Sequence, residues 1–351
     1  MLAVRPDGMG DVLLAGPAVR ALAASGRRVT LLAGPSGAAA AALLPGVTEV
    51  LTWRFPWIDA EPEPVDPDAV RALTEQLRQR QFGSAVIFTS FHQSPLPTAL
   101  LLRMAGVRRI AAISPDYAGA LLDVRHQVDE DVPEPQRALS LARAAGFEPG
   151  LADGGRLAVR SPLPGSGDLT GPLPYTVLHP GASVPARAPS AGRCAAMAAD
   201  LAAAGHRVVI TGGPEQRALT AQVAGRHATD LGGRTSLPEL AAVLAGADVV
   251  VAPNTGAAHL AAAVGTPVVS LFAPVVPAAR WRPYGVPAIV LGDQNAACAG
   301  SRARRCPLPG HPCLDLIEPE EVTRAVAALG GRAAGRPAAS QAATACPAVT
   351  G

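Results

Sequence analysis

Short apolar runs of strand length alternate with longer Ala- and Leu-rich stretches along most of the chain. The runs are hydrophobic at successive positions, which is typical of strands covered on both faces. The stretches between them have the length and composition of helices. The expected strands cover residues 2–4, 29–33, 85–88, 109–113, 175–178, 208–211, 248–252, 268–272 and 288–291. This alternation predicts an α/β fold with parallel sheets and crossover helices.

A segment without hydrophobic periodicity interrupts the pattern near the middle of the chain. Residues 161–174 are rich in Pro, Gly and Ser, which is typical of a linker. The linker separates an N-terminal domain over residues 1–160 from a C-terminal domain over residues 175–329. Residues 330–351 lack apolar periodicity and are expected to form a disordered tail. In parallel α/β sheets, ligands bind in a crevice beyond the carboxyl ends of the strands. A cleft between the two domains would therefore join one such crevice from each sheet.

Composition and charge exclude several classes of protein. Lys plus Arg is 30 and Asp plus Glu is 28, which leaves a net charge of +2, and only 3% of the residues are aromatic. These values argue against a nucleic-acid-binding protein that works through bulk charge or base stacking. The sequence contains no lysine. Any cation in a site must therefore be an arginine, a protonated histidine or a helix N-terminus.

The pattern contains no evident targeting or membrane-spanning segment. Charged residues and a proline interrupt the apolar pieces at the N-terminus, unlike in a signal peptide. The uncharged run over residues 257–279 is long enough to cross a membrane, but a Gly-Thr-Pro turn breaks it in the middle. We therefore expect a cytoplasmic protein without a transmembrane segment, while peripheral contact with a membrane stays open.

A loop with two glycines follows the first expected strand and opens the first expected helix. Gly8 and Gly10 would let the backbone turn sharply and approach a ligand closely. Asp11 stands at the carboxyl end of the strand, where a lone carboxylate could act as a general base. The simpler alternative is that Asp11 is the N-cap of the helix and accepts backbone N–H bonds. The loop has neither a G-x-G-x-x-G fingerprint nor the lysine of a P-loop.

Two loops of the C-terminal half have features of an anion-binding site. Ser183 and Arg187 follow one strand and could hold a phosphate, with Arg187 adding a charge-assisted bond. Thr255 and Gly256 fall at the start of a helix, whose N-terminus attracts anions, and His259 lies one turn further on. The alternatives are a solvated arginine and a histidine that is part of the core.

A third loop carries Glu215 and Gln216, either of which could accept a hydrogen bond from a ribose hydroxyl. A glycine turn with a first-turn acid that the helix dipole favours is an equally good interpretation.

A cysteine-rich segment near the C-terminus could bind zinc. It contains Cys298, Cys306, His311 and Cys313, but their spacing is not a standard zinc pattern and three nearby arginines would repel a cation. The simpler interpretation is a rigid loop with packed thiols and a solvated basic face at Arg302, Arg304 and Arg305.

Taken together, these segments resemble the family 9 glycosyltransferases, the ADP-heptose heptosyltransferase group, over about residues 1–329. The family's opening motif matches residues 8–13, its H-P-G-A-S loop matches residues 179–183, and its strongest motif matches residues 254–260. Residues 265–272, residues 279–285 and the cysteine loop also recur in the family.

The chain departs from the family pattern at three places. Asn254 stands where the family often has Asp. Arg187-Ala188-Pro189 replaces the usual Lys-x-Trp-Pro, and Glu215 comes one place early, with Gln216 in its usual position.

The resemblance implies a GT-B fold: two Rossmann-like doubly wound domains that face a central cleft. The N-terminal domain would bind the acceptor, near Gly8 and Gly10, and the C-terminal domain the nucleotide sugar. Asp11 would be the catalytic base and Arg187 would stabilise the leaving group. The donor-binding residues would be Ser183, Glu215, Gln216, Asn254, Thr255, Gly256 and His259.

The expected activity is that of an inverting glycosyltransferase that needs neither a metal nor a cofactor. The donor would be a nucleotide-diphosphate sugar, with ADP-heptose favoured, and the acceptor a hydroxyl of a glycan, a lipid-linked molecule or a small molecule. One alternative is a GT-B-type sugar-nucleotide epimerase, for which His92 and Asp116 are the only loose candidates. The other is a non-catalytic nucleotide-sugar-binding protein, against which Asp11 argues.

Overall fold

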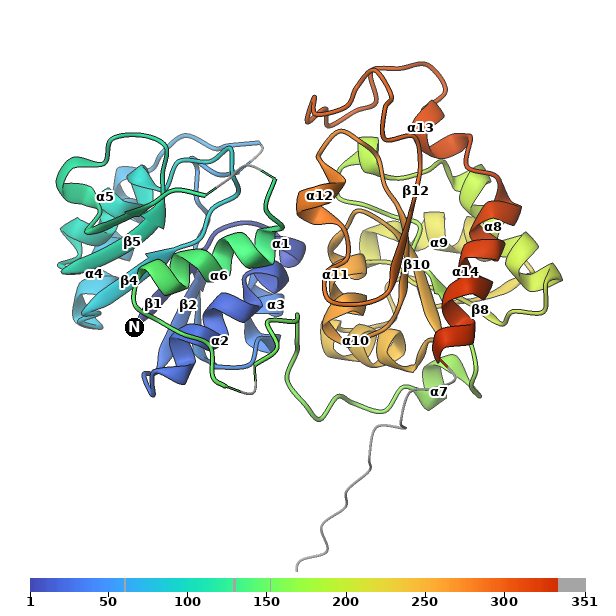
Figure 1. The fold of residues 1–351 in the computed structure, drawn as a ribbon, viewed down its shortest axis with the longest axis horizontal. Coiled ribbons are helices and arrows are strands. Elements are labelled where there is room, and N and C mark those ends of the chain that lie inside the picture. Colours follow the sequence, from blue (N-terminus) through green and yellow to red (C-terminus); the bar gives the residue numbers. More distant parts are fainter. Residues whose placement is uncertain (60, 129–130, 152, 334–351) are drawn as a thin grey trace, which may run out of the picture.

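The computed structural model describes residues 1–59, 61–128, 131–151 and 153–333. In this part of the chain, two six-stranded sheets lie side by side and helices cover both faces of each (Figure 1). All strand pairs within the two sheets are parallel. The predicted α/β class is therefore confirmed.

The first sheet has the strand order β3-β2-β1-β4-β5-β6. The second sheet repeats this order as β9-β8-β7-β10-β11-β12. Both orders are those of doubly wound Rossmann folds. The strands are β1 (Leu2–Arg5), β2 (Val29–Ala33), β3 (Val47–Thr52), β4 (Ser84–Ile87), β5 (Arg109–Ile113), β6 (Val124–His126), β7 (Thr176–Leu178), β8 (Val208–Ile210), β9 (Ala228–Asp230), β10 (Val249–Pro253), β11 (Val268–Leu271) and β12 (Ala288–Leu291).

Helices connect the strands and cover the sheets. They are α1 (Met9–Leu14), α2 (Gly16–Ala24), α3 (Ala38–Leu43), α4 (Pro67–Gln79), α5 (Leu96–Met104), α6 (Glu134–Ala144), α7 (Gly167–Thr170), α8 (Ala191–Ala203), α9 (Arg217–Ala224), α10 (Leu237–Gly246), α11 (Gly256–Ala263), α12 (Ala278–Trp281), α13 (Pro312–Asp315) and α14 (Pro319–Ala333). Short 3₁₀ turns occur at η1 (Gly119–Leu121), η2 (Pro185–Arg187) and η3 (Pro214–Gln216).

Three strands were not predicted, namely β3, β6 and β9. Each is an edge strand of its sheet, and most of its residues are partly or fully exposed. Their sequences therefore lack the continuous apolar run that marks a central parallel strand. The apolar run is present in the central strands β1, β2, β7 and β10, which are buried along their whole length.

The expected linker and tail both contain helical residues. Helix α7 lies inside the predicted linker over residues 161–174. Helix α14 continues to Ala333, past the predicted start of the tail at residue 330. Residues 334–351 of the predicted tail lie outside the described residues.

The two halves of the chain share a continuous apolar core. One buried cluster includes Val12 and Leu13 of α1 together with Ala258 and Ala261 of α11. Helices α1 and α11 face each other across the boundary between the halves (Figure 1). The loops that follow β1 and β10 are thus brought to the same place.

Candidate active site

The strand order reverses between β1 and β4 in the first sheet and between β7 and β10 in the second. Ligands bind doubly wound sheets at this point, outside the carboxyl ends of the strands. Helix α1 follows β1 and residues 88–95 follow β4, while residues 179–187 follow β7 and α11 follows β10. The predicted site residues Asp11, Arg187 and His259 lie on these segments.

Asp11 lies in the first turn of α1 and is held by two neighbours. Its Oδ1 accepts a hydrogen bond from Arg5 Nη2 at 2.9 Å and one from Ser90 Oγ at 3.5 Å. Oδ2 has no hydrogen bond to any described residue, and 30% of the side chain is exposed. The N-cap of α1 is Gly8, not Asp11, so the capping alternative for Asp11 is wrong. A capping side chain must precede the first helical residue, and Asp11 lies inside the helix.

Arg5 is the buried centre of an acidic cluster. It is 2% exposed, forms ion pairs with Asp7 at 3.1 Å and Asp11 at 2.9 Å, and donates to Ser90 Oγ at 3.1 Å. Burial lowers the pKa of Arg5, but Asp7, Asp11 and Glu134 together raise it by more, so its pKa lies above the usual value. For the carboxyl of Glu134, burial acts in the opposite direction and raises the pKa. Arg5 therefore stays charged and fixes the position of the Asp11 carboxylate.

Arg187 ends the 3₁₀ turn η2 and lies opposite this cluster. Its Nε is buried without a hydrogen-bond partner among the described residues. Burial lowers the pKa of Arg187, and Arg304 and Arg302 lower it further, while Asp11 raises it. Ser183, in the same loop, is exposed. The loop thus presents a cation with unused donor capacity and a free hydroxyl.

Helix α11 begins beside this loop. Thr255 is its N-cap, although the Thr255 side chain makes no capping hydrogen bond. Asn254 and His259 are each 3% exposed, and Asn254 Nδ2 and His259 Nδ1 have no partner among the described residues. Burial lowers the pKa of His259 to about 4, so His259 is neutral at pH 7. Unpartnered polar atoms at a helix N-terminus are well suited to an anion.

The three predicted glycines have different surroundings. A Cβ on Gly10 would lie 2.9 Å from His259 Cδ2 and 3.4 Å from Gly256 Cα. On Gly256, a Cβ would overlap the side chain of Met9. Gly8 has only an ordinary contact, with Ser36. Gly10 and Gly256 are therefore needed for the close approach of α1 to α11.

In the loop that begins at Gly212 and Gly213, the Gln216 side chain is bonded to the protein, whereas the Glu215 side chain is exposed. Gln216 Oε1 accepts from the Gly213 N–H at 3.1 Å, and its amide packs against Gly181 of the loop after β7. Glu215 is exposed. Gln216 thus connects two loops, whereas Glu215 is free to meet a ligand.

Several residues of the site were not predicted. Phe91, after β4, contacts Trp281 with ring centroids 5.5 Å apart and an interplanar angle of 53°. The guanidinium of Arg280 lies 3.9 Å from the Phe91 ring centroid, and Arg280 is 4% exposed. The sequence could have indicated Ser90 and Phe91, because both follow β4. That position is informative only once the strand order is known, since the order reverses between β1 and β4.

The cysteine segment is attached to the Arg187 loop. His311 Nε2 lies 3.1 Å from the Ala186 carbonyl oxygen, while Cys298 and Cys313 are buried. Burial, together with Cys298 and Cys306, raises the pKa of Cys313 to about 11. Among the described residues, no group of three or more His, Cys, Asp or Glu side chains could hold a metal ion.

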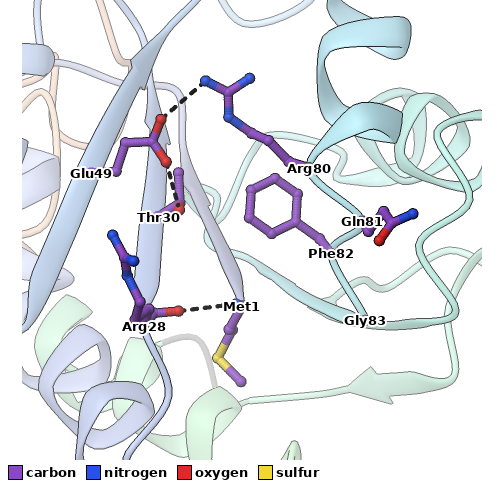
Figure 2. Close-up of a pocket in the computed structure, with 8 residues that line it drawn as sticks. All are labelled: Met1, Arg28, Thr30, Glu49, Arg80, Gln81, Phe82 and Gly83. Carbon is purple, nitrogen blue, oxygen red and sulfur yellow. Dashed lines mark hydrogen bonds and ion pairs between the residues drawn. The ribbon is translucent and has the colours of Figure 1, made fainter.

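A separate pocket of about 290 Å³ lies at the other end of the first sheet (Figure 2). It is lined by residues that precede β1, β2 and β4, among them Met1, Arg28 and Gly83, and by the Arg80–Glu49 ion pair at 3.0 Å. Because these residues stand at the amino ends of the strands, the pocket does not belong to the site around Asp11.

Comparison with known proteins identifies the family. The model for glycosyltransferase family 9 (heptosyltransferase) matches residues 70–311, more than half of the chain. The chain belongs to glycosyltransferase family 9. It is therefore a glycosyltransferase, as the resemblance predicted. No curated protein sequence matches the chain significantly.

Solved structures share the fold of this family member. ADP-heptose LPS heptosyltransferase II of E. coli is 21% identical, with a TM-score of 0.71 over 94% of this chain and 98% of that chain. A family 9 glycosyltransferase from Veillonella parvula DSM 2008 is 16% identical, with a TM-score of 0.75 over 94% and 97%. The E. coli heptosyltransferase WaaC, solved with ADP, is 18% identical, with a TM-score of 0.69 over 93% and 99%. The predicted GT-B fold is thus confirmed.

The epimerase alternative is not supported by the family assignment. Its two candidate residues, His92 and Asp116, are both exposed. Within the described residues, the structure contains no helix that is both long and apolar enough to span a membrane.

Proposed function

We propose that this family 9 glycosyltransferase transfers heptose from ADP-heptose, with inversion and without a divalent metal, to a hydroxyl of a glycan, lipid-linked or small-molecule acceptor. The observation that carries the proposal is the position of Asp11. Arg5 and Ser90 fix one of its oxygens, the other has no partner among the described residues, and the negative charge of Asp11 acts on the pKa of both Arg187 and His259. Two of the similar structures support the choice of donor, since their names specify ADP-heptose or bound ADP.

Asp11 acts as the general base in this proposal. Its free Oδ2 takes the proton of the acceptor hydroxyl as that oxygen attacks the anomeric carbon of the donor. The bond from this carbon to the diphosphate oxygen breaks in the same step, and the configuration inverts. Positioned carboxylates can supply such base catalysis.

Arg187 and the N-terminus of α11 stabilise the leaving diphosphate. Arg187 has an unused buried Nε–H, and Asn254 has an unused side-chain N–H. His259 is neutral at pH 7, so it contributes a hydrogen bond rather than a charge. Preorganised donors aimed at developing charge are an effective source of catalysis.

The two halves divide the work in this proposal. The N-terminal domain, residues 1–160, holds the acceptor beside Asp11. The C-terminal domain, residues 175–329, holds the donor through Ser183, Glu215 and the segment over residues 254–259. The linker over residues 161–174 connects them.

The metal-independent part of the proposal rests on the arginine and the helix N-terminus, which provide positive charge at the leaving group. The Asp-x-Asp pair of residues 66 and 68 is used elsewhere: Asp66 caps α4 by accepting from the Asp68 N–H at 2.8 Å. We expect full turnover in excess chelator. Activity that is lost in chelator and restored by Mg²⁺ or Mn²⁺ would contradict this part.

Thermal stabilisation and turnover together test the donor. A ligand that binds only the folded protein raises the melting temperature. We expect ADP and ADP-heptose to raise it more than UDP, GDP or their sugars. Release of ADP from ADP-heptose should then accelerate when an acceptor is added. Stabilisation by another nucleotide would change the donor, and stabilisation without turnover by any tested acceptor would favour a binding protein.

A further inference from the structure

The arginine-rich part of the cysteine segment is attached directly to the turn that carries Arg187. The N–H of Ala186 donates to the Arg304 carbonyl oxygen at 3.0 Å, and the Ala186 carbonyl oxygen lies 3.1 Å from His311 Nε2. On the other side of this segment, the Arg302 N–H donates to the Val275 carbonyl oxygen at 2.8 Å. The residue before Arg187 is therefore bonded through both backbone groups to this segment, which fixes the segment beside the candidate site.

Arg302 reaches from this segment toward the N-terminal half. Its backbone φ is 58°, a left-handed conformation that a residue with a Cβ rarely adopts. Its guanidinium lies 5.8 Å from the ring centroid of Phe91, which follows β4. Partial shielding of its ring from water lowers the pKa of the neighbouring His92 to about 4, and Arg302 is the largest electrostatic contributor to that decrease. The Arg302 charge therefore lies at the boundary between the halves.

The bonds of Ala186 to Arg304 and His311 hold Arg187 and Arg302 on adjoining stretches of backbone. Among the described residues, neither guanidinium forms an ion pair, whereas Arg304 pairs with Glu61 at 3.7 Å. The pKa of Arg187 is lowered first by burial and then by Arg304 and Arg302, with Asp11 acting in the opposite direction. Like charges held close together are unfavourable unless an anion lies between them.

We propose that Arg302 joins Arg187 in binding the diphosphate of the donor, so that the cysteine segment completes the leaving-group site. This inference rests on the proposed function, because it takes its anion from the nucleotide donor. As the anomeric carbon–oxygen bond breaks, the diphosphate gains negative charge, and a second guanidinium would stabilise it. All three arginines of the basic face expected at Arg302, Arg304 and Arg305 are exposed. Their contacts divide them: Arg302 lies beside Phe91 and binds the ligand in this proposal, Arg304 pairs with Glu61, and Arg305 makes neither contact among the described residues.

Calorimetric titration of the full-length chain with ADP and with AMP tests the inference. The variants are Arg302→Gln and, as the matched control in the same segment, Arg305→Gln, with Arg302→Lys to retain the charge. We expect Arg302→Gln to weaken ADP binding about tenfold to hundredfold, as for loss of a charge-assisted hydrogen bond, with little effect on AMP. Arg302→Lys should recover part of the loss, and Arg305→Gln should resemble the wild type. Melting temperatures of all variants report whether the fold is intact.

Three results would overturn the inference while leaving the proposed function in place. They are, in Arg302→Gln, wild-type affinity for both ligands or an equal loss of both, and, in Arg305→Gln, a loss of ADP binding equal to that in Arg302→Gln. A wild-type chain that binds neither ADP nor AMP would instead overturn the proposed donor, and this inference with it.

Discussion

At the scale of single residues, Asp11 is held by one group that is close in the sequence and one that is distant. Arg5 is six positions before it and Ser90 is 79 positions after it. Both bonds go to Oδ1, so the orientation of the carboxylate is set while its second oxygen remains free. A base whose rotamer is fixed by its neighbours is preorganised for proton transfer.

Replacing Asp11 tests the role of this free oxygen. We expect Asp11→Asn to lower kcat by about 10²–10⁴-fold, the usual contribution of general-base catalysis. The Kd for ADP should change little, because the proposed nucleotide contacts lie in the other half. Asp7→Asn is the matched control, since it also removes a charge paired with Arg5. An equal loss in Asp7→Asn, or a loss below about tenfold in Asp11→Asn, would contradict the assignment.

The motifs predicted Asp11, Arg187, Thr255 and His259 because each lies in the loop or first helical turns that follow a buried strand. The residues that hold Asp11 could not be predicted in the same way. Arg5 comes directly after the first expected strand, but its partners depend on which strands are neighbours. Strand order is set by the packing of distant segments, and a single sequence carries no direct signal for it.

Buried neutral histidines make folding stability depend on pH. His179 is 7% exposed, its Nδ1 lies 3.0 Å from Thr211 Oγ1, and burial lowers its pKa to about 4 from the usual 6.5. Between these two values the unfolded chain binds more protons than the folded chain. The stability contributed by neutral His179 is therefore complete above pH 6.5 and is lost as the pH falls toward 4.

We expect His179→Gln to make this decrease shallower. One such histidine changes the free energy of unfolding by up to about 1.4 kcal/mol per pH unit in that window. Urea unfolding of both proteins at several pH values between 7 and 4.5 measures the slope. His227→Gln, at an exposed position, is the control and should keep the wild-type slope. Parallel curves for His179→Gln and the wild type would show that His179 is not responsible.

At the scale of elements, the contact between α1 and α11 positions the two sides of the site. Met9 of α1 covers Gly256 of α11, and His259 of α11 covers Gly10 of α1. Each helix thus contributes one large side chain and one glycine that leaves room for the large side chain of the other helix. The distance from Asp11 to the start of α11 depends on this fit.

Gly10→Ala should disturb the site without weakening the helix. Alanine is more favourable than glycine within a helix by roughly 0.5–1 kcal/mol, but its Cβ would meet His259 Cδ2 at 2.9 Å. We expect kcat/KM to fall by up to about 10²-fold, as for a small misplacement of reacting groups. Gly192→Ala in α8, where nothing lies within 4 Å, is the control. Wild-type kinetics in Gly10→Ala would show that the spacing is not critical.

At the scale of the whole molecule, two Rossmann-like halves carry different parts of the candidate site. The residues proposed to bind the nucleotide all follow strands of the second sheet, whereas Asp11 follows a strand of the first. Nucleotide binding and base catalysis are thereby assigned to separate halves. The division also explains why a sequence can predict each loop while the site itself emerges only when the halves pack together.

A fragment covering residues 172–333 tests this division. If circular dichroism shows that it folds, we expect it to bind ADP within about tenfold of the intact chain, equivalent to a loss of about 1.4 kcal/mol. Calorimetric titration measures the affinity. A folded fragment that does not bind ADP would show that the first sheet contributes essential nucleotide contacts.

The matched side chains and gaps at α1 and α11 also restrict how this enzyme can be recombined with its relatives. Joining its N-terminal half to the C-terminal half of another family member would keep both sheets. The contact between α1 and α11 could then place two large side chains against each other, where this chain has one large side chain against a glycine. Positions 9 with 256 and 10 with 259 therefore form two units that must be inherited together. We expect a chimera that transfers both pairs to keep its two halves in register, whereas one that splits them would place the proposed base and the proposed nucleotide site at the wrong separation.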